Sequence, residues 1–405
     1  MGYTIGDKFA KLGVDNAPGQ EGRQKNTALP VKGDALPGRA VDFSHGDVDA
    51  FPPTPGALGT FVNGVEAGGV QAYTEYRGKA SIREDLARKL AAFSGAPVDA
   101  DSEIILTPGT QGALFLAMGA LVTRGTKVAI IEPDYFANRK LVEFFDGELV
   151  PVRIRYTDVE HYAGLDLAAL EAAFKNGVEV FLFSNPNNPT GVIYSPEEVA
   201  AIGKLAKQHN VSVIADELYS RQIFSDTLPY THLRALEERP ESLVTIIGPS
   251  KTESLSGYRL GVAYGSADII TRMEKLQAIV SLRAGGYSQA VFADWFAEPE
   301  GWLADRVAKH QAIRDALLAV FRACPGCSAR TTEAGSYVFV ALPGMEVSLD
   351  QFVKLLRQQA GVVVTPGTEF GPQFTSHIRM NFSQDHAAAV DASRRIVTMV
   401  ERYRA

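Results

Sequence analysis

One lysine stands where an amine can act as a nucleophile. Lys251 follows the apolar run 242–247 across a Gly-Pro-Ser turn, and Arg259 comes shortly after it in S-G-Y-R-L-G. A lysine placed after an apolar strand can lose its proton through desolvation and nearby positive charge, which makes the amine a nucleophile. The types and spacing of these residues therefore predict amine chemistry at the end of a strand.

An acid and an anion cradle follow two other strands. Asp216 comes directly after the apolar run 211–215, where a carboxylate is costly to bury without a cationic partner. The run 103–106 leads into T-P-G-T-Q-G-A, which opens a helix whose free N–H groups suit a phosphate, and Thr110 adds a hydroxyl. The segment matches neither the Walker P-loop nor G-x-G-x-x-G, so a nucleotide is not implied.

Asparagines follow a further strand. The run 178–183 ends in S-N-P-N-N-P-T-G, whose prolines and glycine enforce an irregular turn. This places amide groups at a carboxyl strand end, where parallel sheets bind their ligands. The lysine requires an aldehyde, the cradle requires a phosphate, and Asp216 requires a ring with a protonated nitrogen. Pyridoxal phosphate meets all three requirements.

Alternating elements must position these residues. From about residue 80, short β-branched runs alternate with helices, which is typical of an α/β fold with a mostly parallel sheet covered on both faces. The expected helices are 81–93, 111–122, 166–174 and 196–208, and the expected strands are 103–106, 127–131, 148–154, 178–183, 211–215 and 242–247. We expect a three-layer sandwich with a mostly parallel central sheet.

The two ends of the chain have a different pattern. Residues 1–50 are polar and rich in Gly and Pro, and predict an extended arm with one short strand near Ala40–Phe43. Long helices are expected at 266–281 and about 287–323, strands near 336–341, 361–365 and 377–382, and helices at 349–358 and 386–402. The predicted organisation is an arm (1–54), a large cofactor domain (55–290) and a smaller α+β domain built from the arm and residues 291–405.

Composition narrows the class of protein. Forty Lys and Arg against 47 Asp and Glu leave a net charge of −7, which argues against a dedicated binder of nucleic acid or anionic membrane. No apolar run approaches the ~18 residues of a membrane span, and the first residues lack a signal pattern, so we expect a cytoplasmic protein. The C-P-G-C of Cys324 and Cys327 favours a Pro-Gly turn over a redox pair, and zinc would lack ligands. No metal site is predicted.

The ordered motifs resemble a known family. N-N-P-T-G, A-D-E-x-Y and S-K-x-x-x-x-x-G-x-R-x-G occur in the order and spacing of class I/II, fold-type I aminotransferases of the aspartate aminotransferase superfamily, and the match runs from about Asp42 to the C-terminus. The resemblance implies transfer of an amino group between an L-amino acid and a 2-oxo acid, by double displacement through Lys251 with pyridoxal phosphate. It also implies a homodimer with shared active sites.

The resemblance assigns roles position by position. It implies a catalytic set of Lys251, which holds the cofactor, Asp216, which faces the ring nitrogen, and Tyr219, which hydrogen-bonds the ring oxygen. The remaining implied cofactor ligands are Gly109, Thr110, Gln111, Tyr135, Asn188, Ser250 and Arg259, together with Tyr73 of the neighbouring subunit. The substrate carboxylate would be bound by Arg379, Asn188 and Gly46.

Three points stay open in the sequence. Gly248 stands where the family often has Ser or Thr as a phosphate ligand, and Ser250 could compensate. Arg283, in S-L-R-A-G-G-Y-S, resembles an arginine that dicarboxylate-specific relatives donate across the dimer, although a solvated arginine at a helix end is an equally good interpretation. The alternative functions are a lyase or oxidase with the same cofactor, a cofactor-binding regulator, and a nicotinamide-binding Rossmann enzyme.

Overall fold

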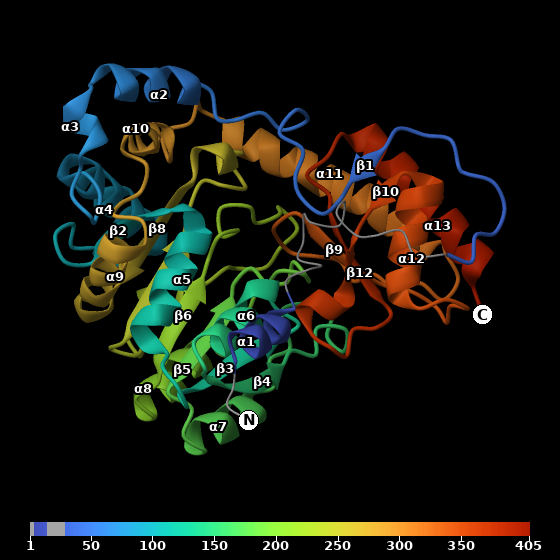
Figure 1. Cartoon of the computed structure of the whole chain (residues 1–405), viewed down its shortest axis with the longest axis horizontal. Coiled ribbons are helices and arrows are strands. Elements are labelled where there is room, and N and C mark those ends of the chain that lie inside the picture. Colours follow the sequence, from blue (N-terminus) through green and yellow to red (C-terminus); the bar gives the residue numbers. More distant parts are fainter. Residues whose placement is uncertain (1–3, 14–28) are drawn as a thin grey trace.

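The computed structural model describes residues 4–13 and 29–405, and a seven-stranded sheet lies at its centre (Figure 1). The strand order is β2-β8-β7-β6-β5-β3-β4; β3 to β7 run parallel, whereas β8 pairs antiparallel with both β2 and β7. The strands are β2 (Ile104–Pro108), β3 (Lys127–Glu132), β4 (Glu148–Arg153), β5 (Val180–Ser184), β6 (Ser212–Asp216), β7 (Leu243–Ile247) and β8 (Leu260–Gly265). The predicted α/β fold with a mostly parallel sheet is confirmed.

Helices cover both faces of this sheet because alternate strand residues point to opposite sides. Val180 and Leu182 of β5 pack with α5, α6 and α9, whereas Phe181 and Phe183 pack with α7 and α8. These helices are α5 (Gly109–Leu121), α6 (Phe136–Phe144), α7 (Leu167–Lys175), α8 (Pro196–Gln208) and α9 (Ala267–Val280). The sandwich has three layers, and the carboxyl ends of its parallel strands share one edge.

The C-terminal residues build a second core with the N-terminal segment. A three-stranded antiparallel sheet in the order β11-β12-β9 packs with α11 and α13, and β1 pairs in parallel with β10. The elements are β1 (Val41–Asp42), α11 (Trp302–Arg322), β9 (Tyr337–Ala341), α12 (Leu349–Leu355), a π-helical turn (Leu356–Ala360), β10 (Val362–Val363), β11 (Thr365–Pro366), β12 (His377–Asn381) and α13 (His386–Tyr403). The short strand expected near Ala40–Phe43 is therefore present, while the boundaries near 54 and 290 stay predictions.

Two sequence expectations are wrong. Part of the supposedly extended arm is helical: α1 (Ile5–Leu12) begins with a capping box between Thr4 and Asp7, whose side chains satisfy free N–H groups of the first turn. The single helix expected at about 287–323 is broken into α10 (Gly286–Gln289), a 3₁₀ turn (Ala290–Asp294) and α11, which starts after Gly301 at a φ of 75°. Residues 1–3 and 14–28 of the arm lie outside the described part of the chain.

The structure also contains elements that the sequence did not predict. Four further elements belong to this part of the chain: strand β8 and the helices α2 (Ala57–Glu66), α3 (Gly69–Ala72) and α4 (Ala80–Ser94). Of these four, only α4 was expected from the sequence. Figure 1 shows α2, α3 and α10 together at one corner of the molecule, remote from α12 and α13. In the described ranges, none of the helices has the length and apolar character needed to cross a membrane.

Candidate active site

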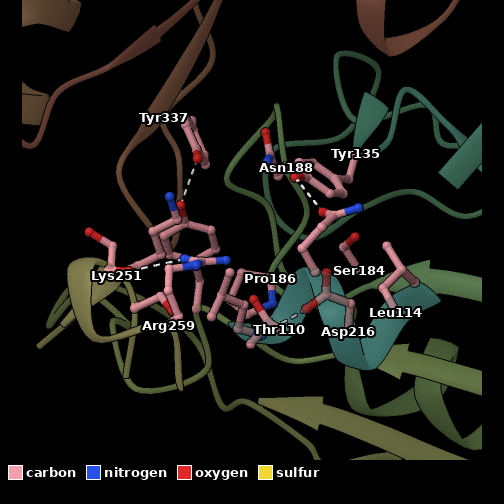
Figure 2. A pocket seen from close by; sticks show the side chains of 15 residues that line it. Thr110, Leu114, Tyr135, Ser184, Pro186, Asn188, Asp216, Lys251, Arg259 and Tyr337 are labelled. Carbon is pink, nitrogen blue, oxygen red and sulfur yellow. Dashed lines mark hydrogen bonds between the residues drawn. The ribbon is translucent and has the colours of Figure 1, made fainter. Parts of the chain in front are cut away.

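A cavity opens where the carboxyl ends of β5 and β6 meet the N-terminus of α5 (Figure 2). Side chains from motifs that lie far apart in the sequence meet in it, as expected for the carboxyl edge of a parallel sheet. The lining residues are Thr110, Gln111, Leu114, Tyr135, Ser184, Pro186, Asn188, Asp216, Leu218, Tyr219, Ser250, Lys251, Ser256, Arg259 and Tyr337. Nine of the predicted site residues are therefore brought together.

The anion cradle is closed by contact between an arginine and a glycine. Gly109 has a φ of 78°, and a Cβ atom built there would lie 2.5 Å from Nη2 of Arg259. The guanidinium also donates to the carbonyl of Ser256 over 3.0 Å, and it lines the cavity together with Thr110 of the first turn of α5. A cation, a hydroxyl and the N-terminus of a helix together suit a phosphate.

The structure explains the glycine at position 248. A Cβ atom there would lie 2.8 Å from Cγ2 of Thr110 and 3.1 Å from the carbonyl oxygen of Leu260. The methyl group of Thr110 therefore occupies the space that a Ser or Thr at 248 would need. Ser250 is buried at the cavity wall, where its Oγ donates to the carbonyl of Leu260 over 3.3 Å.

The loop of Lys251 is fixed by its backbone. The N–H of Ser254 donates to the carbonyl of Lys251 over 3.1 Å, and Arg306 donates to the carbonyl of Thr252 over 2.7 Å. The lysine side chain lines the cavity, and its amine has no hydrogen bond or ion pair within the described residues. The loop is thus ordered while the amine stays available to a ligand.

Asp216, the last residue of β6, lines the same cavity as Thr110. Its Oδ1 accepts a hydrogen bond from the N–H of Leu218 over 3.1 Å, and no cation in the described ranges forms an ion pair with it. Burial raises the pKa of this carboxyl to about 6. A carboxylate in that state gains most from a cationic ligand, because the ligand supplies the missing countercharge.

A second buried acid supports the same region. Asp134 accepts hydrogen bonds from Oγ of Ser184 over 2.6 Å and from the N–H of Tyr135 over 2.7 Å. Burial raises the pKa of Asp134 to about 7, and the charge of Asp216 adds to the rise. Asp134 thus fixes the segment that presents Tyr135, whose hydroxyl donates to Oε1 of Gln111 over 2.9 Å. Gln111 therefore meets the cavity through its side chain.

Tyr219 and Tyr337, which both line the cavity, form a hydrogen-bonded pair. The hydroxyl of Tyr219 donates to that of Tyr337 over 2.6 Å (Figure 2). Burial and the neighbouring Tyr337 raise the pKa of Tyr219 well above its usual value. Burial also acts to raise the pKa of Tyr337, but the charges of Arg379 and Lys251 outweigh it and lower that pKa. The pair therefore offers a neutral donor beside a polarised hydroxyl.

Arg379 is a buried cation without an anion. Arg379 is 2% exposed, and its guanidinium carbon lies 4.5 Å from the ring centre of Tyr337 and 4.8 Å from that of Phe370. The guanidinium donates to Oδ1 of Asn188 over 3.1 Å and to the carbonyl of Ser44 over 2.9 Å. Its Nε has no partner, and none of the described carboxylates forms an ion pair with it. An unpaired buried charge is costly, so this arrangement favours a ligand carboxylate.

The other predicted residues lie elsewhere. Gly46 lines an adjoining cavity that also contains Ser250 and Lys251. Tyr73 is 83% exposed, outside the cavity of its own chain. Arg283 donates to the carbonyl of Thr74 over 2.6 Å, and its guanidinium lies 5.7 Å from the ring centre of Tyr73. Neither residue reaches the site within this protomer.

Sequence reasoning missed several residues of the site. Tyr337 and Asp134 are the most important, because one pairs with Tyr219 and the other supports the wall behind Asp216. Their signals were present but weak, since Tyr337 lies within the predicted strand 336–341 and Asp134 comes shortly after the predicted strand 127–131. Across the described ranges, no group of three or more His, Cys, Asp or Glu could hold a metal ion.

Comparison with known proteins gives consistent relatives. Residues 51–395 match the family described as aminotransferase class I and II. The putative aminotransferase YugH of Bacillus subtilis is 31% identical over 78% of this chain and 80% of its own, and the aspartate aminotransferase of Pyrococcus horikoshii is 26% identical over 81% and 83%. The crystal structure of an aspartate aminotransferase from Rhodobacter sphaeroides is 62% identical, with a TM-score of 0.94 over 99% of this chain and 100% of that one.

Proposed function

Because the chain belongs to the aminotransferase class I and II family and is a pyridoxal-phosphate-dependent transaminase, we propose that Lys251 holds the cofactor and that aspartate is the amino donor. One observation carries the assignment of the site. Three groups without a partner of opposite charge meet at one cavity. The amine of Lys251 and the carboxyl of Asp216 line it, and the guanidinium of Arg379 donates to Asn188 in its wall.

The residues present fit the cofactor. Thr110, Ser250 and Arg259 would bind its phosphate, and Asp216 would pair with its protonated ring nitrogen. Tyr219 and Asn188 would hydrogen-bond the oxygen of the ring, and the ring of Tyr135 would pack on its face. When bound, the cofactor supplies an aldehyde that condenses with amines and a ring that accepts electrons from the substrate Cα.

The chain's own residues would then act in a defined order. Arg379, oriented by Asn188, binds the substrate α-carboxylate as a two-pronged donor, a task that lysine cannot perform. Lys251 lines the same cavity, and its amine, when it is not bonded to the cofactor, would take the proton from Cα as a base and return one as an acid. Over the whole double displacement, the first amino acid would leave as its 2-oxo acid and a second 2-oxo acid would leave as an amino acid, so Arg379 would bind both carboxylates in turn.

The substrate proposal rests on relatives and on Arg283. Two of the relatives are named aspartate aminotransferases, and one of them shares 62% of its residues with this chain. A second carboxylate needs a second cation, which Arg283 would supply from the neighbouring subunit. Its position beside Tyr73, the residue expected to reach the partner's phosphate site, supports this proposal, because both side chains would then cross together.

An exposed apolar surface supports a homodimer. Near Tyr73 and Arg283, helices α2, α3 and α10, the end of α9 and the loop after it present large hydrophobic side chains to solvent. Figure 1 shows α2, α3 and α10 together at one corner of the molecule. They are Leu58, Val62, Val65, Val70, Ile279, Val280, Leu282 and Tyr287. Apolar surface of this extent on a single chain marks an association site. A cytoplasmic location stays a prediction.

A single-turnover experiment tests the proposed reaction. Aspartate without an acceptor should bleach the yellow absorbance of the bound cofactor and release a single equivalent of the corresponding 2-oxo acid per site. Adding a 2-oxo acid acceptor should convert this burst into continuous turnover. Turnover without an acceptor, with ammonia or peroxide as product, would instead favour a lyase or oxidase, and bleaching only by other amino acids would reject aspartate.

Subunit mixing tests the shared site. Lys251→Ala protein and Tyr73→Phe/Arg283→Ala protein should each turn over aspartate poorly. After subunit exchange, mixed dimers combine an intact Lys251 with intact Tyr73 and Arg283 from the partner, so activity should recover to about a quarter of wild type by random pairing. The matched control pairs Lys251→Ala with Arg379→Ala, which lie in the same site of one chain. That mixture should not recover, and equal recovery in both mixtures would contradict the proposal.

A further inference from the structure

Two thiols meet in a turn after α11, away from the catalytic cavity. Cys324 and Cys327 are the two cysteines of the chain, and their Sγ atoms lie 3.1 Å apart. The N–H of Cys327 donates to the carbonyl of Cys324 over 3.1 Å, and Gly326 has a φ of 75°. Pro at the second position and Gly with positive φ at the third define a type II β-turn.

This turn geometry suits a disulfide. A β-turn brings the Cα atoms of its first and fourth residues within about 7 Å, and disulfides span Cα separations of roughly 4.4–6.8 Å. The thiols already touch, so their side chains point toward each other rather than apart. The Pro-Gly turn predicted from the sequence is present, and it is the turn itself that pairs the sulfurs.

The surroundings allow a reagent to reach one sulfur. Cys324 is buried, whereas Cys327 is half-buried. Nη2 of Arg404 lies 3.7 Å from Sγ of Cys324, on the buried side of the pair. Burial and the neighbouring thiol raise the pKa of Cys327 to about 12. Oxidation should therefore be slow at neutral pH and accelerate as the pH rises.

We propose that Cys324 and Cys327 form a reversible intramolecular disulfide when a small-molecule disulfide is present. The Cys327 thiolate attacks one sulfur of the reagent, forms a mixed disulfide and expels one thiolate. The Cys324 thiolate then attacks Sγ of Cys327 and expels the second. The two cysteines are oxidised, the reagent is reduced to two thiols, and the protons of the protein thiols pass to the two leaving groups.

The two cysteines do not belong to a metal site within the described residues. Structural zinc requires four ligands, and the described residues place no third Cys, His, Asp or Glu with these sulfurs in a group that could hold a metal ion. Glu401 lies 3.6 Å from Cys324 through Oε1, but it is engaged by Arg404 over 2.6 Å. Oxidation is therefore the chemistry that the pair supports.

Mass spectrometry of the full-length holoenzyme tests the proposal. After incubation with glutathione disulfide, acid quenching and alkylation under denaturing conditions, the wild type should lose both alkylation sites without retaining glutathione. Cys324→Ser should instead keep glutathione on Cys327, because no second thiol can expel it. Below the pKa of Cys327 the rate should rise about tenfold per pH unit, since the thiolate fraction does so.

Two outcomes would overturn the disulfide. The first is a wild type that retains glutathione as stably as Cys324→Ser, which would mean that the ring does not close. The second is a Cys324→Ser protein that takes up no glutathione, which would mean that Cys327 is not reachable in the fold. Cys327→Ser serves as the matched control, because its buried Cys324 should react far more slowly. None of these results depends on the transaminase assignment.

Discussion

Replacing Lys251 by alanine should lower kcat by at least about 10⁴-fold, because one amine performs two tasks in the proposed reaction. A positioned general base alone contributes about 10²–10⁴-fold, and loss of the nucleophile that holds the cofactor adds to this. The fold should be unaffected, since within the described residues the amine of Lys251 makes no hydrogen bond or ion pair. Steady-state kinetics and thermal unfolding of the same preparation measure the two effects.

Small primary amines separate the chemical role of Lys251 from a structural one. If the lysine acts as base, added methylamine should restore part of the lost rate, in proportion to the free-base concentration. Lys275→Ala, at an exposed position on α9, is the matched control and should keep wild-type kinetics. A Lys251→Ala protein within tenfold of wild type, or one that amines do not rescue, would remove Lys251 from the role of base.

The meeting of the motifs was predictable from the sequence because parallel strands end together. In the structure, Ser184 at the end of β5 is the register partner of Asp216 at the end of β6. Apolar β-branched runs mark such strands, and the polar residue after each run therefore falls at one edge of the sheet. Eight of the nine predicted residues that line the cavity follow the end of a strand in this way, whereas Arg259 precedes the antiparallel strand β8.

Contacts between distant segments were not predictable in the same way. Arg379 is held by the carbonyl of Ser44 and by Asn188, both of which lie far from it in the sequence. Tyr337 begins β9 of the three-stranded sheet, whereas Tyr219 follows β6 of the seven-stranded sheet, so their hydrogen bond joins the two sheets. No local periodicity encodes such a pairing, whose register depends on the finished core.

Local sequence explains why strand β8 was not predicted and why the helix expected at 287–323 is interrupted. Strand β8 reads L-G-V-A-Y-G, and its two glycines weaken the strand signal. A Cβ on Gly261 would nevertheless lie 2.3 Å from the backbone of Gly109, so the glycine permits the close approach that forms the anion cradle. The helix expected at 287–323 contains Pro299 and Gly301, which interrupt the helical hydrogen bonds although the apolar spacing continues.

Replacing Asp216 by asparagine should separate function from stability. Asparagine has nearly the same shape but no charge, so it cannot hold a ring nitrogen protonated, and kcat should fall by about 10³-fold or more on the scale of lost electrostatic stabilisation. The yellow cofactor should also bind more weakly, because the cavity loses the only carboxylate in its described lining. Kinetics and equilibrium dialysis of the cofactor measure these losses.

In the cofactor-free protein, Asp216→Asn should raise the melting temperature. Burial raises the pKa of Asp216 from 3.8 to about 6, so the folded state binds this proton more tightly than the unfolded state. Between those pH values the unfolded state carries fewer protons, and this group therefore lowers stability as the pH rises to about 6, with no further change above it. Asp216→Asn lacks that loss, so its apoprotein should melt at a higher temperature than wild type at pH 8, with the gap closing toward pH 4.

A neighbouring acid provides the control for this comparison. Asp134 is also buried, with its pKa raised to about 7, but it does not line the cavity. Asp134→Asn should therefore alter the pH dependence of melting while the protein still takes up cofactor, whereas Asp216→Asn should alter both. If Asp216→Asn binds cofactor as tightly as wild type, its role at the ring nitrogen is wrong; if its melting follows the wild-type pH curve, the raised pKa is wrong. Together, these measurements would identify Asp216 as a residue that lowers the stability of the cofactor-free protein and raises that of the cofactor-bound protein.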